Sequence, residues 1–254
     1  MTPDLVSRVR PPAWVGVVVP PANPTVEPEL ARCLDGVLTL FTARFPVMPD
    51  TTLEQRNRRY LEHYRDGIGA FGSLGLRALV MALTGPSYRL LPDGDRALAR
   101  ELSQRAGRPV ITASIAIAEA AAATGARRLC LLSPYPQWLT DEAAAYWRAA
   151  GHDVAQVVKI SETFRAYELS EDEVSTALRQ VDAGAVDAVV MSGTGMLTLP
   201  SIVAARATMP IPLLSSNLCC AWWLLRQSAQ RAGSDLFTRA APELAASLAR
   251  TPSA

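Results

Sequence analysis

A short phrase that ends in threonine and glycine occurs twice in this chain of 254 residues. The first copy, VMALTG, covers residues 80–85, and the second, VMSGTG, covers residues 190–195. Each copy stands at the end of an apolar run of strand length. The backbone N–H groups and the threonine hydroxyl of each copy are therefore expected at the edge of the sheet. Open α/β sheets bind ligands at the carboxyl ends of their strands. The repeat therefore predicts two similar halves that share one site, with Thr84, Gly85, Thr194 and Gly195 among its residues.

A second candidate site is the phrase GVVVPPANPTVEPE at residues 16–29. A continuous apolar strand is followed at once by Pro21, Asn23 and Thr25, where a helix is expected to begin. An amide side chain, a hydroxyl and free N–H groups at such a place can bind an anion. The alternative is that Asn23 or Thr25 only caps the helix.

Three further polar residues follow expected strands and are candidates for ligand contact. Ser87 lies just beyond the first Thr-Gly turn, and Tyr135 follows Ser133 and a proline. The alternative for Tyr135 is a half-buried packing role. Asn217 begins the last long helix, where ligand contact and helix capping are equally open.

The four cysteines lack CxxC spacing and the chain has only two histidines, so neither a zinc site nor a disulfide framework is expected. Cys219 and Cys220 fall in the first turn of a predicted helix, and a helix N-terminus lowers the pKa of a thiol. Neighbouring helical residues point about 100° apart, so at most one of the two faces the site. Cys219 is therefore a candidate proton donor, with buried packing as the alternative. Cys33 and Cys130 are expected in the core.

The composition excludes several kinds of partner. The 25 basic and 24 acidic residues are mixed along the chain, which predicts no surface for nucleic acid or anionic lipid. The apolar runs are too short to span a membrane, and residues 1–12 lack the apolar stretch of a signal peptide. We therefore expect a flexible lead over residues 1–12 and a cytoplasmic protein. No phosphate-binding glycine motif falls in a strand-to-helix loop, so no nucleotide cofactor is expected.

Strand-like and helix-like runs alternate along the whole chain, which is typical of parallel βαβ units. The expected strands cover residues 15–19, 37–45, 78–82, 109–112, 129–132, 154–160, 188–191 and 211–214. The expected helices cover residues 26–34, 53–71, 96–105, 115–123, 138–149, 171–181, 201–208 and 218–231. This order predicts an α/β fold of two halves with about four parallel strands each.

The phrase at residues 16–29 resembles the opening of the maleate isomerase branch of the aspartate/glutamate racemase superfamily, which also contains arylmalonate decarboxylase. The resemblance continues, in order, through LTGPSYR at 83–89, LLSPY at 131–135, SGTGMLTLPSI at 192–202 and SSNLCCAWW at 215–223. It implies two pseudo-symmetric flavodoxin-like halves, residues 13–115 with 213–250 and residues 116–212. It also implies a site at their interface that needs no cofactor, a small carboxylic or dicarboxylic acid as substrate, and a possible homodimer or higher homo-oligomer.

The resemblance further implies that donors from both halves surround a carboxylate. The catalytic candidates are then Tyr135, Thr84 and Thr194, with Asn23 and the two glycines beside them. The reactive cysteines of the family match Leu83 and Gly193 here, and neither offers a base or a nucleophile. Racemisation with two thiols is therefore disfavoured.

The loop before the helix at residue 171 corresponds to a family segment that closes over the substrate. Thr163 stands where the family often has asparagine, and Arg165 is a candidate clamp for a second carboxylate. The alternative for Arg165 is a solvated loop position.

Three functions remain open on this basis. The first is an isomerase or decarboxylase that stabilises an enolate or enediolate by hydrogen-bond donors. Decarboxylation tolerates the missing thiols better, because breaking the C–C bond needs anion stabilisation and desolvation rather than a base. The second is a non-catalytic carboxylate-binding or regulatory homologue, and the third is a lyase or hydratase. The proton donor stays open between Tyr135, Cys219 and water.

Overall fold

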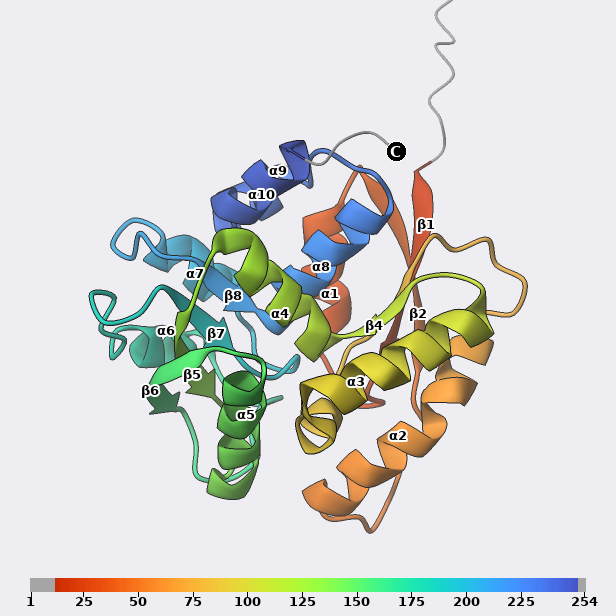
Figure 1. Cartoon of the computed structure of the whole chain (residues 1–254), viewed down its shortest axis with the longest axis horizontal. Helices are drawn as coiled ribbons and strands as arrows, with labels where there is room; N and C mark the ends of the chain where they lie inside the picture. Colours follow the sequence, from red (N-terminus) through yellow and green to blue (C-terminus); the bar gives the residue numbers. More distant parts are fainter. Residues whose placement is uncertain (1–11, 251–254) are drawn as a thin grey trace, which may run out of the picture.

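The computed structural model describes residues 12–250 and contains two four-stranded sheets in which all neighbouring strands are parallel (Figure 1). The strand orders are β2-β1-β3-β4 and β6-β5-β7-β8, so the second sheet repeats the first. This order is that of a flavodoxin-like sheet. The predicted pair of four-stranded halves is therefore confirmed. The strands are β1 (Ala13–Val19), β2 (Leu38–Arg44), β3 (Leu79–Met81), β4 (Val110–Thr112), β5 (Arg128–Ser133), β6 (Asp153–Lys159), β7 (Ala188–Met191) and β8 (Leu213–Ser215).

Helices connect the parallel strands, as crossover connections require. None of the helices within residues 12–250 is both long and apolar enough to cross a membrane. They are α1 (Val26–Leu34), α2 (Leu53–Gly69), α3 (Gly85–Ala106), α4 (Ala113–Thr124), α5 (Gln137–Ala149), α6 (Glu171–Leu178), α7 (Leu199–Ala205), α8 (Ser216–Gln227), α9 (Asp235–Ala240) and α10 (Pro242–Ala249).

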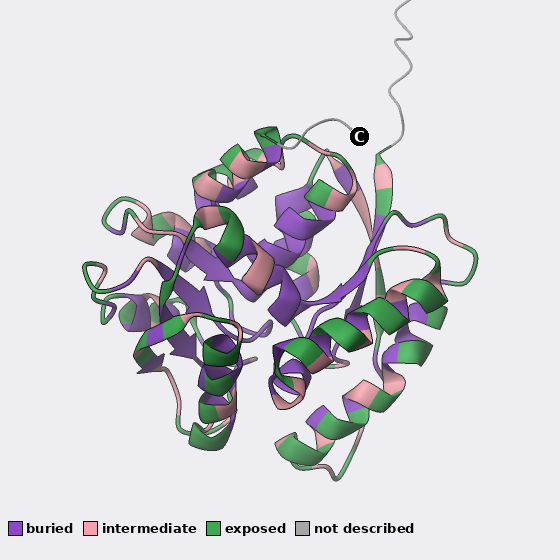
Figure 2. Cartoon of the chain, in the orientation of Figure 1, coloured by how far each residue is buried: buried purple, intermediate pink, exposed green. Residues whose placement is uncertain are grey.

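The central strands are buried, which explains their continuous apolar sequences. Val15, Val17 and Val19 of β1 are inaccessible to solvent, and so are Val189 and Val190 of β7. Figure 2 shows the buried strands in the interior and the exposed residues on the outer sides of the helices. Sheets covered by helices on both faces need apolar residues at every strand position rather than at alternate ones.

The structure corrects three details of the predicted elements. The strand β8 pairs with β7, so residues 213–215 lie in the second sheet and not in the first half. The helix that follows, α8, packs against α1 and α4. The predicted assignment of the other residues to the two halves stays a prediction. The helix expected from residue 96 begins at Gly85, because α3 continues through a kink where Leu91 has φ 55° beside Pro92. Helices α9 and α10 were not predicted.

The expected flexible lead, residues 1–12, lies outside the described residues except for residue 12. The spacing GxGxxG does occur at residues 67–72, across the end of α2. A dinucleotide-binding motif needs this spacing between a strand and the start of a helix. The glycines here follow a helix and precede β3, so they lack that context.

Candidate functional site

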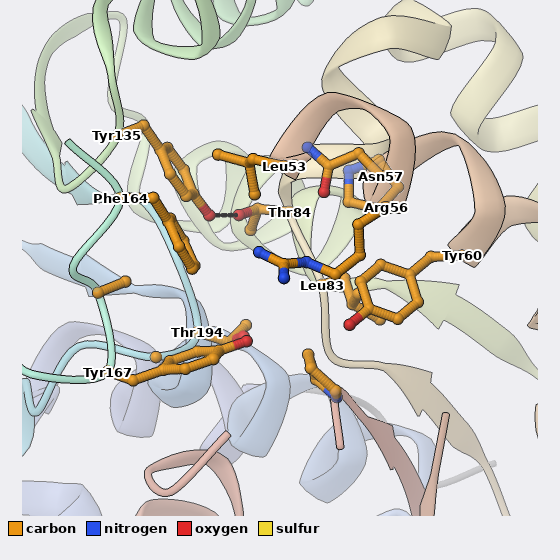
Figure 3. A pocket seen from close by; sticks show the side chains of 15 residues that line it. Leu53, Arg56, Asn57, Tyr60, Leu83, Thr84, Tyr135, Phe164, Tyr167 and Thr194 are labelled. Atoms are coloured by element: carbon orange, nitrogen blue, oxygen red, sulfur yellow. Dashed lines mark hydrogen bonds between the residues drawn. The ribbon is translucent and has the colours of Figure 1, made fainter. Parts of the chain in front are cut away.

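A pocket lies at the carboxyl ends of the strands, between the two sheets (Figure 3). Both Thr-Gly turns line it, one after β3 and one after β7. The pocket and its open mouth together contain about 410 Å³ of atom-free space, open solvent included. Its lining residues are Pro20, Leu53, Arg56, Asn57, Tyr60, Leu83, Thr84, Gly85, Pro86, Tyr135, Phe164, Ala166, Tyr167, Thr194 and Gly195.

The two sheets meet in the pocket through a pair of hydroxyl groups. The hydroxyl oxygens of Thr84 and Tyr135 lie 2.7 Å apart, and both side chains are buried. Burial raises the pKa of Tyr135 well above its ordinary range, so the phenol keeps its proton. Behind this pair, the Tyr88 hydroxyl forms a hydrogen bond with Ser192, and burial raises the pKa of Tyr88 to about 12. The pair therefore consists of neutral hydroxyls that can donate hydrogen bonds to an anion.

Thr194 has different partners from Thr84, although the two occupy matching places in the repeat. Its hydroxyl donates to the carbonyl of Ala82 at 2.9 Å and accepts from Asn23 Nδ2 at 3.2 Å. Asn23 Oδ1 accepts from the backbone N–H groups of Thr25 and Val26 and so caps the start of α1. The hydroxyl proton of Thr194 is thus used to join the two sheets rather than offered to the pocket.

The other residues predicted around the first phrase are also outside the pocket lining. Thr25 Oγ1 donates to the carbonyl of Gly195 at 2.8 Å, and the carbonyl of Pro21 accepts from Arg44 at 2.9 Å. Pro20 lines the pocket, whereas Pro21, which was predicted to do so, does not. Asn23 therefore fits the capping alternative, whereas the Thr25 side chain makes no capping hydrogen bond and donates to Gly195 instead.

A buried carboxylate next to the pocket explains the position of Asn217. Glu29 of α1 is 2% exposed and accepts hydrogen bonds from Thr198 N at 2.6 Å, Leu199 N at 2.7 Å and Asn217 Nδ2 at 2.8 Å. Asn217 also donates to the carbonyl of Thr194 at 3.1 Å. Burial raises the pKa of Glu29, and the hydrogen bonds oppose that shift. Asn217 thus contacts a protein carboxylate and lies outside the pocket lining.

No thiol lines the pocket in the described part of the chain. Cys219 and Cys220 are fully buried within α8, and burial raises the pKa of both thiols. They are the fourth and fifth residues of that helix, so the predicted place in its first turn is wrong by about one residue. Cys33 and Cys130 are also buried, as expected. A pocket role for Cys219 is not supported by this arrangement.

The two positions at which the sequence resemblance predicts the family's cysteines are occupied in different ways. Leu83 lines the pocket directly. Gly193 has φ +93°, and a Cβ atom there would lie 3.0 Å from Pro134 Cγ and 3.1 Å from Tyr135 Oη. A side chain at residue 193 would therefore be strained and would press on the hydroxyl pair. Ser87, also predicted at this end of β3, is buried outside the pocket lining.

The loop before α6 contacts the pocket through residues other than those predicted. Arg165 forms ion pairs with Glu168 at 3.6 Å and Glu173 at 3.4 Å and lies outside the pocket lining, as does Thr163. Phe164 and Tyr167, on either side of Arg165, line the pocket instead. The Phe164 ring is stacked with Tyr135 at a centroid distance of 6.1 Å. The predicted carboxylate clamp at Arg165 therefore does not match the structure.

One face of α2 was missed by the sequence reasoning. The pocket-lining residues Leu53, Arg56, Asn57 and Tyr60 are spaced i, i+3, i+4 and i+7, which places them on one side of the helix. Figure 3 shows the Arg56 guanidinium directed from α2 toward the middle of the pocket. The sequence signal that could have revealed this face is the presence of Arg56 and Asn57 at positions that helical spacing places beside Leu53 and Tyr60.

The pocket therefore combines hydroxyls, amides and one guanidinium. Its lining contains no cysteine, histidine or carboxylate. Residues 12–250 also contain no group of three side chains that could hold a metal ion. Such a set of donors can bind and stabilise an anion, and its tyrosines can supply a proton.

Comparisons with known proteins agree with the resemblance seen in the sequence. The maleate isomerase of Nocardia farcinica is 26% identical over 226 residues, which cover 84% of this chain and 88% of that protein. The structure of the maleate isomerase Iso from Pseudomonas putida superimposes with a TM-score of 0.82 at 20% identity, over 92% of this chain and 99% of the other. The structure of a Nocardia farcinica maleate cis-trans isomerase mutant with a covalently bound succinylcysteine intermediate superimposes with a TM-score of 0.80 at 21% identity. The match covers 91% of this chain and 98% of the other.

These structural likenesses establish a shared fold. The match that decides the family is to its sequence model, which is that of arylmalonate decarboxylase and covers residues 15–244. That range includes both Thr-Gly turns, every pocket-lining residue and all eight strands except the first two residues of β1. On this evidence the chain belongs to the arylmalonate decarboxylase family.

Proposed function

We propose that this protein is an enzyme that acts on a small carboxylic or dicarboxylic acid without a cofactor and passes through an enolate or enediolate. The observation that carries the proposal is the pair of buried, neutral hydroxyls of Thr84 and Tyr135, 2.7 Å apart in the pocket between the sheets. Membership of the arylmalonate decarboxylase family and the likeness to maleate isomerases support an acid as the substrate.

The hydroxyl pair suits an anion that carries charge on two oxygens. The two hydroxyls share one hydrogen bond with each other, and an entering carboxylate oxygen would accept from both. Gly85, the first residue of α3, lines the same pocket, and its N–H group has no acceptor within the helix. An enediolate has more charge on these oxygens than a carboxylate, so the same donors bind it more strongly. Each such donor contributes about 3 kcal/mol.

The absence of a thiol from the pocket lining favours decarboxylation over isomerisation through a covalent adduct. The Nocardia farcinica isomerase is described with a succinylcysteine intermediate. The sequence resemblance predicts Leu83 and Gly193 at the positions of the family's cysteines. In a decarboxylation, the bond between the α-carbon and the departing carboxylate breaks, CO₂ leaves, and the electron pair stays in the enediolate. The Tyr135 hydroxyl then gives its proton to the α-carbon, and the phenolate regains a proton from water.

A second candidate function is a carboxylate-binding protein that does no chemistry. The lining supports this alternative because it contains no side chain with an ordinary pKa near neutrality. Such a protein would bind acids with the same donors and release them unchanged.

The possible homodimer also stays a prediction, which sedimentation velocity of the full chain would test.

Incubation with candidate acids distinguishes these functions. Phenylmalonate, methylmalonate and maleate would be followed in D₂O by NMR, which detects loss of CO₂, isomerisation and deuterium at the α-carbon. The proposal predicts turnover of at least one acid and a loss of about 10²-fold to 10³-fold in Tyr135→Phe with the fold intact. If calorimetry detects binding of an acid and NMR detects no turnover of any acid, the second candidate function, a carboxylate-binding protein, would be favoured. Absence of binding would contradict the site itself.

A further inference from the structure

The α2 side of the pocket carries a cation that no carboxylate in the described part of the chain neutralises. Within residues 12–250, Arg56 forms no ion pair, and its guanidinium carbon lies 5.7 Å from the centroid of the Phe164 ring. The acid nearest to it along the helix, Glu54, is paired with Arg58 at 2.7 Å and with Arg89 at 3.3 Å. Arg56 is half-buried, so its charge is only partly solvated. A guanidinium in this position favours an anion beside it.

A second observation on the same helix also indicates a missing partner. The side chain of Asn57 lines the pocket, is 4% exposed, and its Nδ2 has no hydrogen-bond acceptor in the structure. A buried N–H group without a partner typically costs about 1–3 kcal/mol. The amide lies against Gly85, where a Cβ atom would come within 2.8 Å of Nδ2. Asn57 and Arg56 both line the pocket and bring two kinds of donor to it.

The two sides of the pocket differ in charge. On the Tyr135 side the donors are neutral hydroxyls, which suit the oxygens where charge develops during the reaction. On the α2 side the donors are a full cation and an amide, which suit a carboxylate that is already charged when the substrate binds. Figure 3 shows the guanidinium of Arg56 between these two sides, facing the Tyr135 and Phe164 wall from α2.

We propose that Arg56 and Asn57 form a second anion subsite that binds the second carboxylate of a dicarboxylic acid, the one that the Thr84–Tyr135 pair does not hold. This inference rests on the proposed function, because the Thr84–Tyr135 pair holds the carboxylate whose oxygens belong to the enediolate. Arg56 is then a specificity-determining residue. It selects acids with two anionic groups over acids in which an apolar group replaces the second carboxylate, and it orients them toward Tyr135.

Matched pairs of small acids test the subsite by calorimetry on the full chain. The pairs are malonate with propanoate, succinate with butanoate, and maleate with (Z)-but-2-enoate, which differ only in whether the second carboxylate is present. We expect the wild type to bind at least one diacid tenfold or more tightly than its monoacid. Arg56→Met removes that preference and leaves the monoacid within twofold, and Arg56→Lys keeps part of it. Arg59→Met, an exposed neighbour on α2, is the matched control and changes neither affinity.

The outcomes separate this inference from the proposed function. If the monoacids bind and respond to Tyr135→Phe while Arg56→Met changes diacid and monoacid equally, the subsite is wrong and the site survives. If no acid binds the wild type, the proposed function fails and the subsite fails with it. Asn57→Asp provides a second variant should Arg56→Met fold poorly. Its added negative charge would weaken the diacid at least fivefold more than the monoacid, and an equal effect on both would overturn the inference.

Discussion

Thr84 and Tyr135 form a hydrogen bond of 2.7 Å across the interface of the two sheets, although they lie 51 positions apart in the chain. Thr84 follows β3 of the first sheet, and Tyr135 follows β5 of the second. Neither sheet alone supplies the pair, so the donors are placed by the packing of the two halves. Any change that alters that packing changes the distance between the hydroxyls.

Removing the Thr84 hydroxyl should weaken the stabilisation of the enediolate without unfolding the protein. Thr84→Val keeps the shape of the side chain and removes the donor, and we expect kcat/KM to fall about 10²-fold to 10³-fold. Thr84→Ser keeps the hydroxyl and should keep most of the activity. Steady-state kinetics with circular dichroism checks both variants. Equal activity of the valine and serine variants would exclude a role for this hydroxyl.

The matching threonine of the other half should affect stability instead. Thr194→Val leaves the buried carbonyl of Ala82 without its donor and Asn23 Nδ2 without its acceptor. We expect a loss of about 1–3 kcal/mol in the free energy of unfolding, measured by urea denaturation. Thr194→Ser should stay close to the wild type. A Thr194→Val protein with unchanged stability and greatly reduced turnover would reverse the roles assigned to the two threonines.

The fold could be predicted from the sequence because each element has a local signature. Apolar runs such as residues 15–19 read as buried parallel strands, and the repeated order of elements indicated the two halves. Where a local signal conflicted with the structure, the prediction was wrong. The helix predicted over residues 96–105 begins at Gly85 instead, because α3 passes Pro92 with a kink at Leu91.

The partners of the polar residues could not be predicted in the same way. The sequence placed Asn23 and Asn217 at the correct sheet edge, but it could not distinguish a ligand from a protein group 171 or 188 residues away. Arg56 was missed for a related reason. The apolar face of the helix at residues 53–71 is expected to pack inward. An arginine at the end of such a face is normally solvated, and only the opposite wall of the pocket shows that Arg56 faces a cavity.

Asp95 should make the stability of the protein depend on pH. Its carboxyl is inaccessible to solvent, accepts from Thr112 at 2.8 Å and Tyr146 at 2.9 Å, and has its pKa raised by burial from 3.8 to about 6. Between these values the folded protein binds more protons than the unfolded chain. The stability that this group contributes is therefore full below pH 3.8 and is lost as the pH rises through about 6.

Asp95→Asn removes the titration and keeps an oxygen that can accept both hydrogen bonds. Relative to the wild type, the variant should gain about 3 kcal/mol between pH 4 and pH 7, because one pKa unit corresponds to about 1.4 kcal/mol. Urea unfolding across that range measures the difference. Asp93→Asn, two residues away and fully exposed, is the matched control and should show no such trend. A stability difference that does not vary with pH would contradict the protonated state of Asp95.

Gly193 should tolerate no side chain. With φ at +93° and Tyr135 Oη only 3.1 Å from the position that a Cβ atom would take, Gly193→Ala strains the backbone and displaces the hydroxyl pair. We expect a loss of about 1–3 kcal/mol in stability together with reduced turnover. Gly75→Ala is the control, because its Cβ would meet no atom within 4 Å and its φ is not positive. Normal activity in Gly193→Ala would show that Tyr135 can move without consequence.

The buried thiols should take no part in the reaction. Iodoacetamide attacks a thiolate, and burial both shields Cys219 and Cys220 and raises their pKa. We expect mass spectrometry to find these cysteines unlabelled in the folded protein and labelled after denaturation in guanidinium chloride. Leu83→Cys places a thiol in the pocket lining, and that variant should gain one label that a bound acid blocks. Inactivation of the wild type by labelling of Cys219, prevented by the same acid, would instead make that thiol part of the site and remove the reason for assigning the proton to Tyr135.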